Sequence, residues 1–126
     1  MSYTGNMIEY LHSTGEAIAP IQTLRSGSWL RCERPTEEEV SELLTLGMDE
    51  DMISDALDPH EVPRIEFDDE WTYLIARLPD TDDDFNDFTT PILFCLNKDY
   101  AVTLSRDSLG RLWQPFIDQA RSRTDR

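Results

Sequence analysis

The chain has 126 residues, a length that suits one domain with a single hydrophobic core. Its net charge of −15 disfavours nucleic acid and anionic lipid as partners, and favours divalent cations or basic protein surfaces. No stretch approaches the roughly 18–20 apolar residues of a membrane-spanning helix, and no secretory signal begins the sequence, so this chain by itself is predicted to be soluble.

The first part of the chain predicts three strands separated by polar turns. Residues 7–12 alternate in hydropathy as a strand does, and residues 17–24 form the return strand, interrupted at Pro20. A polar break then precedes a short strand over residues 28–32. These segments predict a sheet that begins near the N-terminus.

Two helices are expected next. Thr36 is a suitable N-cap with Glu39 three residues later, the spacing of a capping box, and Gly47 is the expected C-cap. A second, shorter helix begins near Asp49 and is ended by Pro59. The apolar residues expected to face the core are Val40, Leu43, Leu44, Met52, Ile53, Ala56 and Leu57.

The second half of the chain predicts two hairpins. Residues 64–67 and 71–78 are extended, and the latter are apolar on both alternating faces, as in a strand that is covered on both sides. Residues 91–96 show the same two-faced pattern and pair with residues 100–105 across a turn at 97–99. The interleaved strands and helices predict an α/β fold with a mixed β-sheet flanked by helices, in one domain over residues 1–126.

A final amphipathic helix is predicted from Asp107 or Ser108 onward. Its apolar residues follow helical spacing: Leu109, Leu112, Trp113, Phe116, Ile117 and Ala120. It ends in Arg121, Arg123 and Arg126 with no Gly or Pro stop there, which is the pattern of a helix that continues in a longer parent chain.

The acidic segment over residues 80–87 invites comparison with a calcium-binding loop. Oxygen-bearing side chains stand at its positions one, three and five. The sixth position, however, holds Phe85 where the sharp turn needs Gly, and the twelfth holds Pro91 where the ion needs Glu. The segment is therefore predicted to be a solvated hairpin tip.

Residues suited to catalysis do not form a recognisable constellation. His12 and His60 lack companions at metal-binding or catalytic spacing, and no nucleophile-elbow or phosphate-binding motif occurs. Cys32 and Cys95 lie far apart in apolar segments, which predicts buried thiols in a reducing compartment. The sequence thus argues against an enzyme.

The second predicted helix contains the most suggestive charges. Asp51, Asp55 and Asp58 are spaced by four and three residues, so they share one edge of a continuous helix. Like charges at this spacing repel one another unless a cation or a basic partner relieves them. The edge is either a metal-binding surface or an exposed acidic helix surrounded by water and sodium.

Several short motifs, taken in order, resemble the cytosolic domain of CorA-type magnesium channels. They are Trp29, Pro35-Thr36-Glu37-Glu38-Glu39, Gly47, Asp55-Ala56-Leu57, Pro63-Arg64-Ile65-Glu66, the strand over residues 71–78, Thr90-Pro91-Ile92 and Tyr100-Ala101-Val102-Thr103. The resemblance extends over roughly residues 7 to 120. It implies a CorA soluble-domain fold.

The resemblance also implies a function. CorA-type proteins are homopentamers in which Mg²⁺ between neighbouring cytosolic domains favours the closed channel. Asp55 matches a carboxylate of that inter-subunit site, Ser54 stands where some members have a second acid, and Asp58 completes the predicted half-site. The expected ion, both regulatory and transported, is Mg²⁺, with Co²⁺ or other divalent ions as alternatives.

The rest of the parent protein is expected to supply the stalk helix with the partner carboxylate, the two membrane helices and the pore. The domain would then lie at the cytoplasmic face of the cell membrane, and the present chain alone is expected to be monomeric or weakly oligomeric. Two other functions stay open: a zinc transporter of the same superfamily, and a stand-alone acidic module that binds a basic protein. An enzyme is a distant third.

Overall fold

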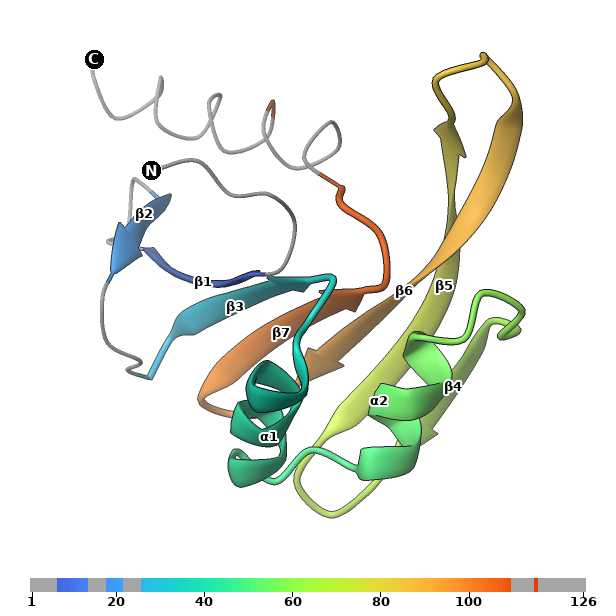
Figure 1. Cartoon of the computed structure of the whole chain (residues 1–126). Coiled ribbons are helices and arrows are strands. Elements are labelled where there is room, and N and C mark those ends of the chain that lie inside the picture. Colours follow the sequence, from blue (N-terminus) through green and yellow to red (C-terminus); the bar gives the residue numbers. More distant parts are fainter. Residues whose placement is uncertain (1–6, 14–17, 22–25, 110–114, 116–126) are drawn as a thin grey trace.

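The computed structural model describes residues 7–13, 18–21, 26–109 and 115. Most of these residues belong to one β-sheet or to the helices and loops next to it. Among these residues seven strands lie in the order β2-β1-β3-β7-β6-β5-β4 (Figure 1). The strands are β1 Met7–Ser13, β2 Ile18–Ile21, β3 Ser28–Glu33, β4 Arg64–Phe67, β5 Thr72–Thr81, β6 Asp87–Leu96 and β7 Tyr100–Ser105. β3 and β7 are parallel and the other neighbouring pairs are antiparallel, so the predicted mixed sheet is confirmed.

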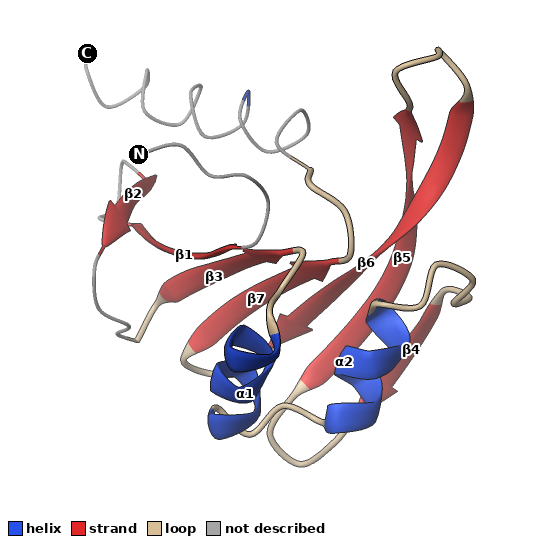
Figure 2. Ribbon diagram, viewed as in Figure 1, coloured by secondary structure: helices blue, strands red, loops and turns tan. Residues whose placement is uncertain are grey.

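Two helices, α1 Glu37–Thr45 and α2 Glu50–Ala56, lie on the same face of the sheet (Figure 2). The predicted capping box is present: Glu39 N donates to Thr36 Oγ1 at 3.2 Å, and Thr36 N donates to Glu39 Oε1 at 3.0 Å. The C-cap is Leu46 rather than Gly47, which follows with a φ of +93°. Glycine adopts that angle without the steric cost that a Cβ imposes, so it reverses the chain between the helices.

α2 is short, and it ends earlier than expected. The Asp49 carboxylate is its N-cap and accepts hydrogen bonds from the N–H groups of Asp51 and Met52. The helix stops at Ala56, with Leu57 as C-cap, three residues before the predicted stop at Pro59. The residues between Leu57 and β4 therefore form a loop.

The main core lies between the helices and the sheet face that they cover. Its buried members are Leu30, Cys32, Leu43, Met48, Met52, Ile53, Ala56, Trp71, Tyr73, Ile75, Leu93, Cys95, Val102 and Leu104. The strand residues in this group mostly alternate along their strands, as one face of a pleated sheet requires. Both predicted buried cysteines belong to the group and are free thiols.

The β5–β6 hairpin is longer than the sequence suggests. Pairing continues to Thr81 and Asp87, which leaves only residues 82–86 as the turn in place of the predicted loop over 80–87. The prediction that residues 71–78 are covered on both sides is wrong, because Thr72 and Leu74 are exposed on the face away from the helices. β6 agrees better with its prediction, since Ile92 and Leu93 are buried on opposite faces.

Several large apolar side chains are exposed on the face away from the helices. Ile65 is paired with Leu74, and Phe67 is paired with Thr72, which in turn is paired with Leu96. Phe67 is 74% exposed, Ile65 is 59% exposed and Leu96 is 53% exposed. The other residues that the structure describes do not cover this end of the sheet.

Part of the sequence prediction cannot be compared with this fold. Residues 107–109 are not helical, residue 115 is helical, and the other residues of the predicted final helix lie outside the described residues. The N–H of Leu109 donates to the Glu33 carboxylate at 3.2 Å, and Thr90 Oγ1 donates to Asp107 Oδ2 at 2.6 Å. These bonds fix the chain as it leaves β7.

Candidate functional site

The three predicted metal-site residues lie near one another in sequence but in different settings. Ser54 and Asp55 belong to the last turn of α2, and Asp58 lies in the loop that follows. Ser54 and Asp58 are exposed, whereas the Asp55 side chain is 39% exposed. Because α2 ends at Ala56, the predicted common helical edge of Asp51, Asp55 and Asp58 does not extend to Asp58.

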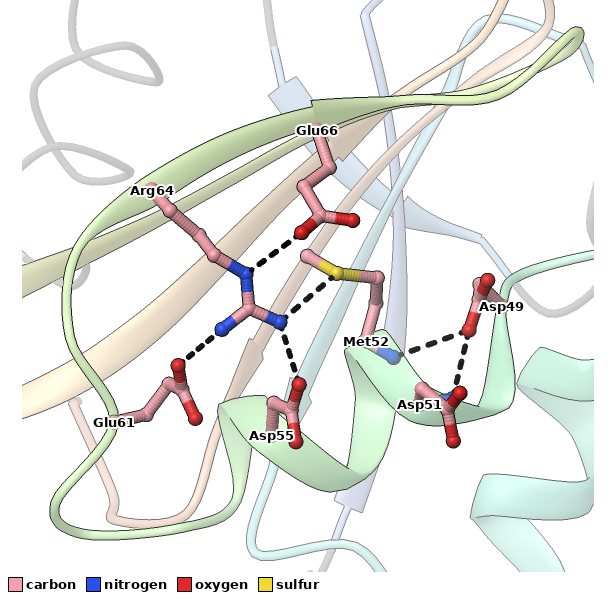
Figure 3. A network of polar contacts seen from close by, with 7 residues as sticks. All are labelled: Asp49, Asp51, Met52, Asp55, Glu61, Arg64 and Glu66. Atoms are coloured by element: carbon pink, nitrogen blue, oxygen red, sulfur yellow. Dashed lines mark hydrogen bonds and ion pairs between the residues drawn. The ribbon is translucent and has the colours of Figure 1, made fainter.

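The direction of each side chain follows from how α2 packs. Met52, Ile53 and Ala56 are buried against the sheet, so they define the inner side of the helix. Ser54 is exposed on the outer side, and Asp55 lies on the flank that borders β4 (Figure 3). The helix thereby directs one carboxylate toward the first residue of β4.

That residue is Arg64, and its guanidinium binds carboxylates from three parts of the chain (Figure 3). Nη2 donates to Asp55 Oδ2 at 2.5 Å, Nη1 donates to Glu61 Oε1, and Nε donates to Glu66 Oε1 at 3.1 Å. Nη2 also lies 3.4 Å from Met52 Sδ. We call Arg64, Asp55, Glu61 and Glu66 the Arg64 cluster.

The cluster is partly removed from solvent. The Arg64 side chain is 28% exposed and that of Glu61 is 15% exposed. The pKa of Arg64 is raised above its usual value, chiefly by the hydrogen bond with Asp55. The basic partner that relieves the acidic flank of α2 is therefore an arginine of the same chain.

A second arginine fixes the loop between α2 and β4. Arg77, on β5, donates through Nη1 to the carbonyl oxygens of Pro59 and Glu61 at 3.0 and 2.9 Å. Its Nε and Nη2 donate to the hydroxyl and carbonyl oxygens of Thr89 on β6 at 2.8 Å each. The backbone of Glu61 is thus tied to the sheet, which helps to direct its carboxylate toward Arg64.

Tyr73 anchors the other end of α2. Its hydroxyl accepts the N–H of Asp49, the N-cap residue, at 2.8 Å and donates to Asp68 Oδ2 at 3.0 Å. Asp68 Oδ1 accepts the N–H groups of Trp71 and Glu70, and these bonds lower the pKa of Asp68. Both ends of the short helix are therefore attached to the β4–β5 region.

In the turn of the β5–β6 hairpin, an aspartate accepts hydrogen bonds from the turn itself and not from an arginine. Asp82 Oδ1 accepts the N–H groups of Asp84 and Asn86, each at 2.9 Å, and Oδ2 accepts the Asn86 side-chain amide at 3.3 Å. These bonds, above all those from Asn86, lower the pKa of Asp82. Phe85 has a φ of +62° and is 88% exposed. Since Asp82 serves the turn's own backbone, this geometry agrees with the predicted solvated tip.

The donor atoms near Asp55 suit a hard cation, but they do not enclose one. Carboxylate and hydroxyl oxygens of Asp55, Ser54 and Asp58 are the ligand type that Mg²⁺ prefers. Asp58 Oδ1 accepts the N–H of His60, and Asp55 Oδ2 is bound by Arg64. Within the described ranges, no group of three or more His, Cys, Asp or Glu side chains is arranged to hold a metal. These residues fit at most one side of a site for a hydrated ion.

Sequence reasoning missed Arg64 as a partner of Asp55. The two residues are nine positions apart, with a helix end and a loop between them, so no helical or strand periodicity relates them. The available signal is the positive charge within Pro63-Arg64-Ile65-Glu66, which follows the acidic helix along the chain. Charge complementarity between the two segments could have suggested the contact.

The two thiols are not reactive groups. Cys32 and Cys95 are fully buried in the core, and burial raises the pKa of both. The physical cause is desolvation beneath the helices, which disfavours the charged thiolate. Because the thiolate is the reactive form, these cysteines are packing residues, as the sequence predicts.

The fold of this chain is shared by solved structures of other proteins. It is similar to the complete structure of the CorA magnesium transporter from Methanocaldococcus jannaschii, with a TM-score of 0.73, 20% identity, and coverage of 98% of this chain and 39% of that one. It is equally similar to the soluble domain of CorA from the same organism, with a TM-score of 0.73, 22% identity, and coverage of 94% and 48%. The chain therefore has the fold of the CorA soluble domain.

The family follows from the sequence match. Residues 25–126 match the family described as CorA-like Mg²⁺ transporter protein, and the chain belongs to that family. Members of this family are transporters and not enzymes. No curated protein sequence matches the chain closely enough to count as a relative.

A ZntB cytoplasmic domain is also similar in fold to this chain. The ZntB cytoplasmic domain from Vibrio parahaemolyticus RIMD 2210633 gives a TM-score of 0.71 at 14% identity, with coverage of 95% of this chain and 51% of that one. The present chain thus spans about 39% to 51% of the length of these solved structures. No helix within the described residues has the length and apolar character of a membrane span.

Proposed function

We propose that this chain is the cytosolic regulatory domain of a CorA-type channel for divalent cations, in which Mg²⁺ held beside Asp55 between neighbouring copies favours the closed state. The observation that supports the proposal most directly is the position of Asp55: a partly exposed carboxylate on the flank of α2, in a chain of the CorA-like family. Ser54 and Asp58 supply further oxygens nearby, and the site needs a second carboxylate from the neighbouring copy.

Electrostatics provide the link between ion level and assembly. Each copy carries a net charge of −15, so copies arranged in a ring, a pentamer in this proposal, repel one another. A divalent cation that binds only between assembled copies stabilises the assembled arrangement by linkage. The closed ring is then favoured when the ion is abundant and loosened when it is scarce.

The expected affinity is weak, which suits this task. Mg²⁺ gives up its water shell reluctantly and is bound by one or two carboxylates while it keeps several waters. A site of that kind responds to an ion that is abundant in the cytosol. The transported ion in this proposal is the same Mg²⁺, with Co²⁺ as an alternative, and the domain lies at the cytoplasmic face of the membrane.

The test uses the protein as its complete gene encodes it. Resistance to a protease is measured while Mg²⁺ is titrated, in the wild type, in Asp55→Asn and in Asp51→Asn. Asp51 is an exposed acid on the same helix and is the matched control. We expect Asp55→Asn to require at least about tenfold more Mg²⁺ for the same protection, since a carboxylate ligand is lost, and Asp51→Asn to resemble the wild type. Unchanged protection in Asp55→Asn would contradict the proposal.

Zinc transport is the second candidate. The ZntB cytoplasmic domain is almost as similar in fold as the CorA structures, with a TM-score of 0.71 against 0.73. The oxygen ligands of Asp55 and Ser54 favour Mg²⁺, because zinc prefers nitrogen and sulfur donors. Uptake of Mg²⁺, Co²⁺ and Zn²⁺ by cells that express the complete gene distinguishes the two candidates.

A further inference from the structure

One guanidinium faces three carboxylates in the Arg64 cluster, which leaves the cluster with a net charge of −2. The three acids come from α2, from the loop after it and from β4. Their meeting at a single arginine is a feature of the tertiary structure. This arrangement places the positive charge of Arg64 beside Asp55, the carboxylate that binds the cation in the proposed function.

The Asp55 carboxylate is bonded to the protein on one side and exposed to solvent on the other. Its Oδ2 atom accepts the hydrogen bond from Arg64 Nη2 at 2.5 Å, while 39% of the side chain is exposed. A cation that approaches from solvent therefore meets a carboxylate whose charge is already partly neutralised. The positive guanidinium also repels the approaching ion.

We infer that Arg64 competes with the divalent cation for Asp55 and so sets the ion level at which the domain responds. The inference rests on the proposed function and names a regulatory residue of the same site. In this view Arg64 is the partner of Asp55 when the ion is scarce, and the cation replaces it when the ion is abundant.

The exchange leaves no charge without a partner. When Asp55 turns to the cation, Arg64 keeps its bonds to Glu61 Oε1 and Glu66 Oε1. An arginine held by Asp55 alone would instead be left as an uncompensated, partly buried charge, which is strongly unfavourable. Glu61 is well placed for this role because Arg77 fixes its backbone.

Coulomb's law gives the size of the effect. A unit charge about 5 Å from a divalent ion, in a medium close to water, changes the ion's affinity by about tenfold. Removing the Arg64 charge should therefore tighten Mg²⁺ binding at Asp55 by about tenfold. This increase in Mg²⁺ affinity should disappear when Asp55 is replaced by Asn.

The first experiment measures Mg²⁺ affinity by isothermal titration calorimetry at constant ionic strength, with the full-length protein. The variants are Arg64→Met, Asp55→Asn and the double variant, with Arg64→Lys as the matched control because it keeps the charge. We expect Arg64→Met to bind Mg²⁺ about tenfold more tightly, and Arg64→Lys to stay within about threefold of the wild type. Both Asp55→Asn proteins should bind about equally weakly.

The second experiment needs no variant, so it stands even where Arg64→Met fails to fold. The side-chain Nε–H signals of the arginines are followed by NMR in the full-length protein during a Mg²⁺ titration. We expect the Arg64 signal to shift, and the Arg77 signal to stay fixed, since Arg77 bonds to Thr89 and to loop carbonyls away from Asp55. Sodium chloride at equal ionic strength should not reproduce the shift.

The outcomes separate this inference from the proposed function. Loss of Mg²⁺ binding in Asp55→Asn, together with wild-type affinity in Arg64→Met and an unmoved Arg64 signal, overturns the role of Arg64 and leaves the proposed function standing. Equal Mg²⁺ affinity in the wild type and Asp55→Asn overturns both. A tighter Arg64→Met that loses its gain in the double variant supports both.

Discussion

The two acidic regions of the molecule, the Arg64 cluster and the turn over residues 82–86, differ in what satisfies their carboxylates. In the cluster, a guanidinium from β4 binds acids of α2, the loop and β4. In the turn, the Asp82 carboxylate accepts backbone and side-chain N–H groups from residues two and four positions later. One region is held by tertiary contacts and the other by local ones. The number of acids therefore does not distinguish a cluster held by tertiary ion pairs from a turn capped by its own backbone.

The largest expected effect is the loss of the Arg64 charge. Arg64→Met leaves three carboxylates close together, and we expect it to lower the free energy of unfolding by about 2 kcal/mol, between the values for exposed and buried ion pairs. Urea denaturation measures the change. Arg106→Met is the control: Arg106 forms an exposed pair with Asp107 at 3.6 Å, and its loss should cost less than about 0.5 kcal/mol. Equal losses in the two variants would show that the cluster is no stronger than a surface pair.

Tyr73→Phe tests whether α2 depends on tertiary contacts at its other end. The variant deprives the N–H of Asp49 of its acceptor and Asp68 of a donor, so we expect the free energy of unfolding to fall by about 1 kcal/mol. Urea denaturation again measures the loss. Tyr10→Phe removes a longer, exposed bond to Glu42 at 3.3 Å and should cost clearly less. A cost for Tyr10→Phe as large as that for Tyr73→Phe would contradict the anchoring role.

The Asp68 carboxylate is expected to make a smaller contribution to the stability of the fold, and this contribution depends on pH. Its pKa in the folded state is lowered from 3.8 by hydrogen bonds from the backbone of Trp71 and Glu70. A depressed folded-state pKa contributes stability that is present above the unfolded pKa and is lost as the pH falls through the folded value. We therefore expect the melting temperature of Asp68→Asn to fall less steeply than that of the wild type below about pH 4. Parallel curves would argue against this contribution.

The smallest expected effect is at the turn. Asp82→Ala removes the acceptor of the Asp84 and Asn86 N–H groups, so these amides should exchange with solvent faster. The amide of Ile92, in the middle of β6, serves as the control. It should exchange as in the wild type, because the hydrogen bonds of Asp82 join only residues within the turn. Faster exchange at Ile92 would show that the turn supports the whole hairpin. Hydrogen exchange followed by NMR makes the comparison.

Much of the fold could be predicted because it depends on local signals. The capping box at Thr36 and Glu39, the start of the second helix near Asp49 and the strand over residues 64–67 are all present as expected. The exact ends of β5 and β6 were less predictable, since pairing between the two strands carries them beyond their apolar residues into Asp80 and Asp87. The exposed side of Leu74 was also missed, because an apolar strand looks the same whether or not another layer covers it.

The mixed α/β fold class, the acidic composition and the position of Asp55 on a short helix could be read from the sequence, because capping, periodicity and charge act between residues that are close along the chain. The bond between Asp55 and Arg64, by contrast, is visible only in the folded molecule. That contact depends on where α2 ends, on the loop tied down by Arg77 and on the placement of β4 at the edge of the sheet. Contacts of this kind join residues through folded geometry, and no spacing along the chain encodes them.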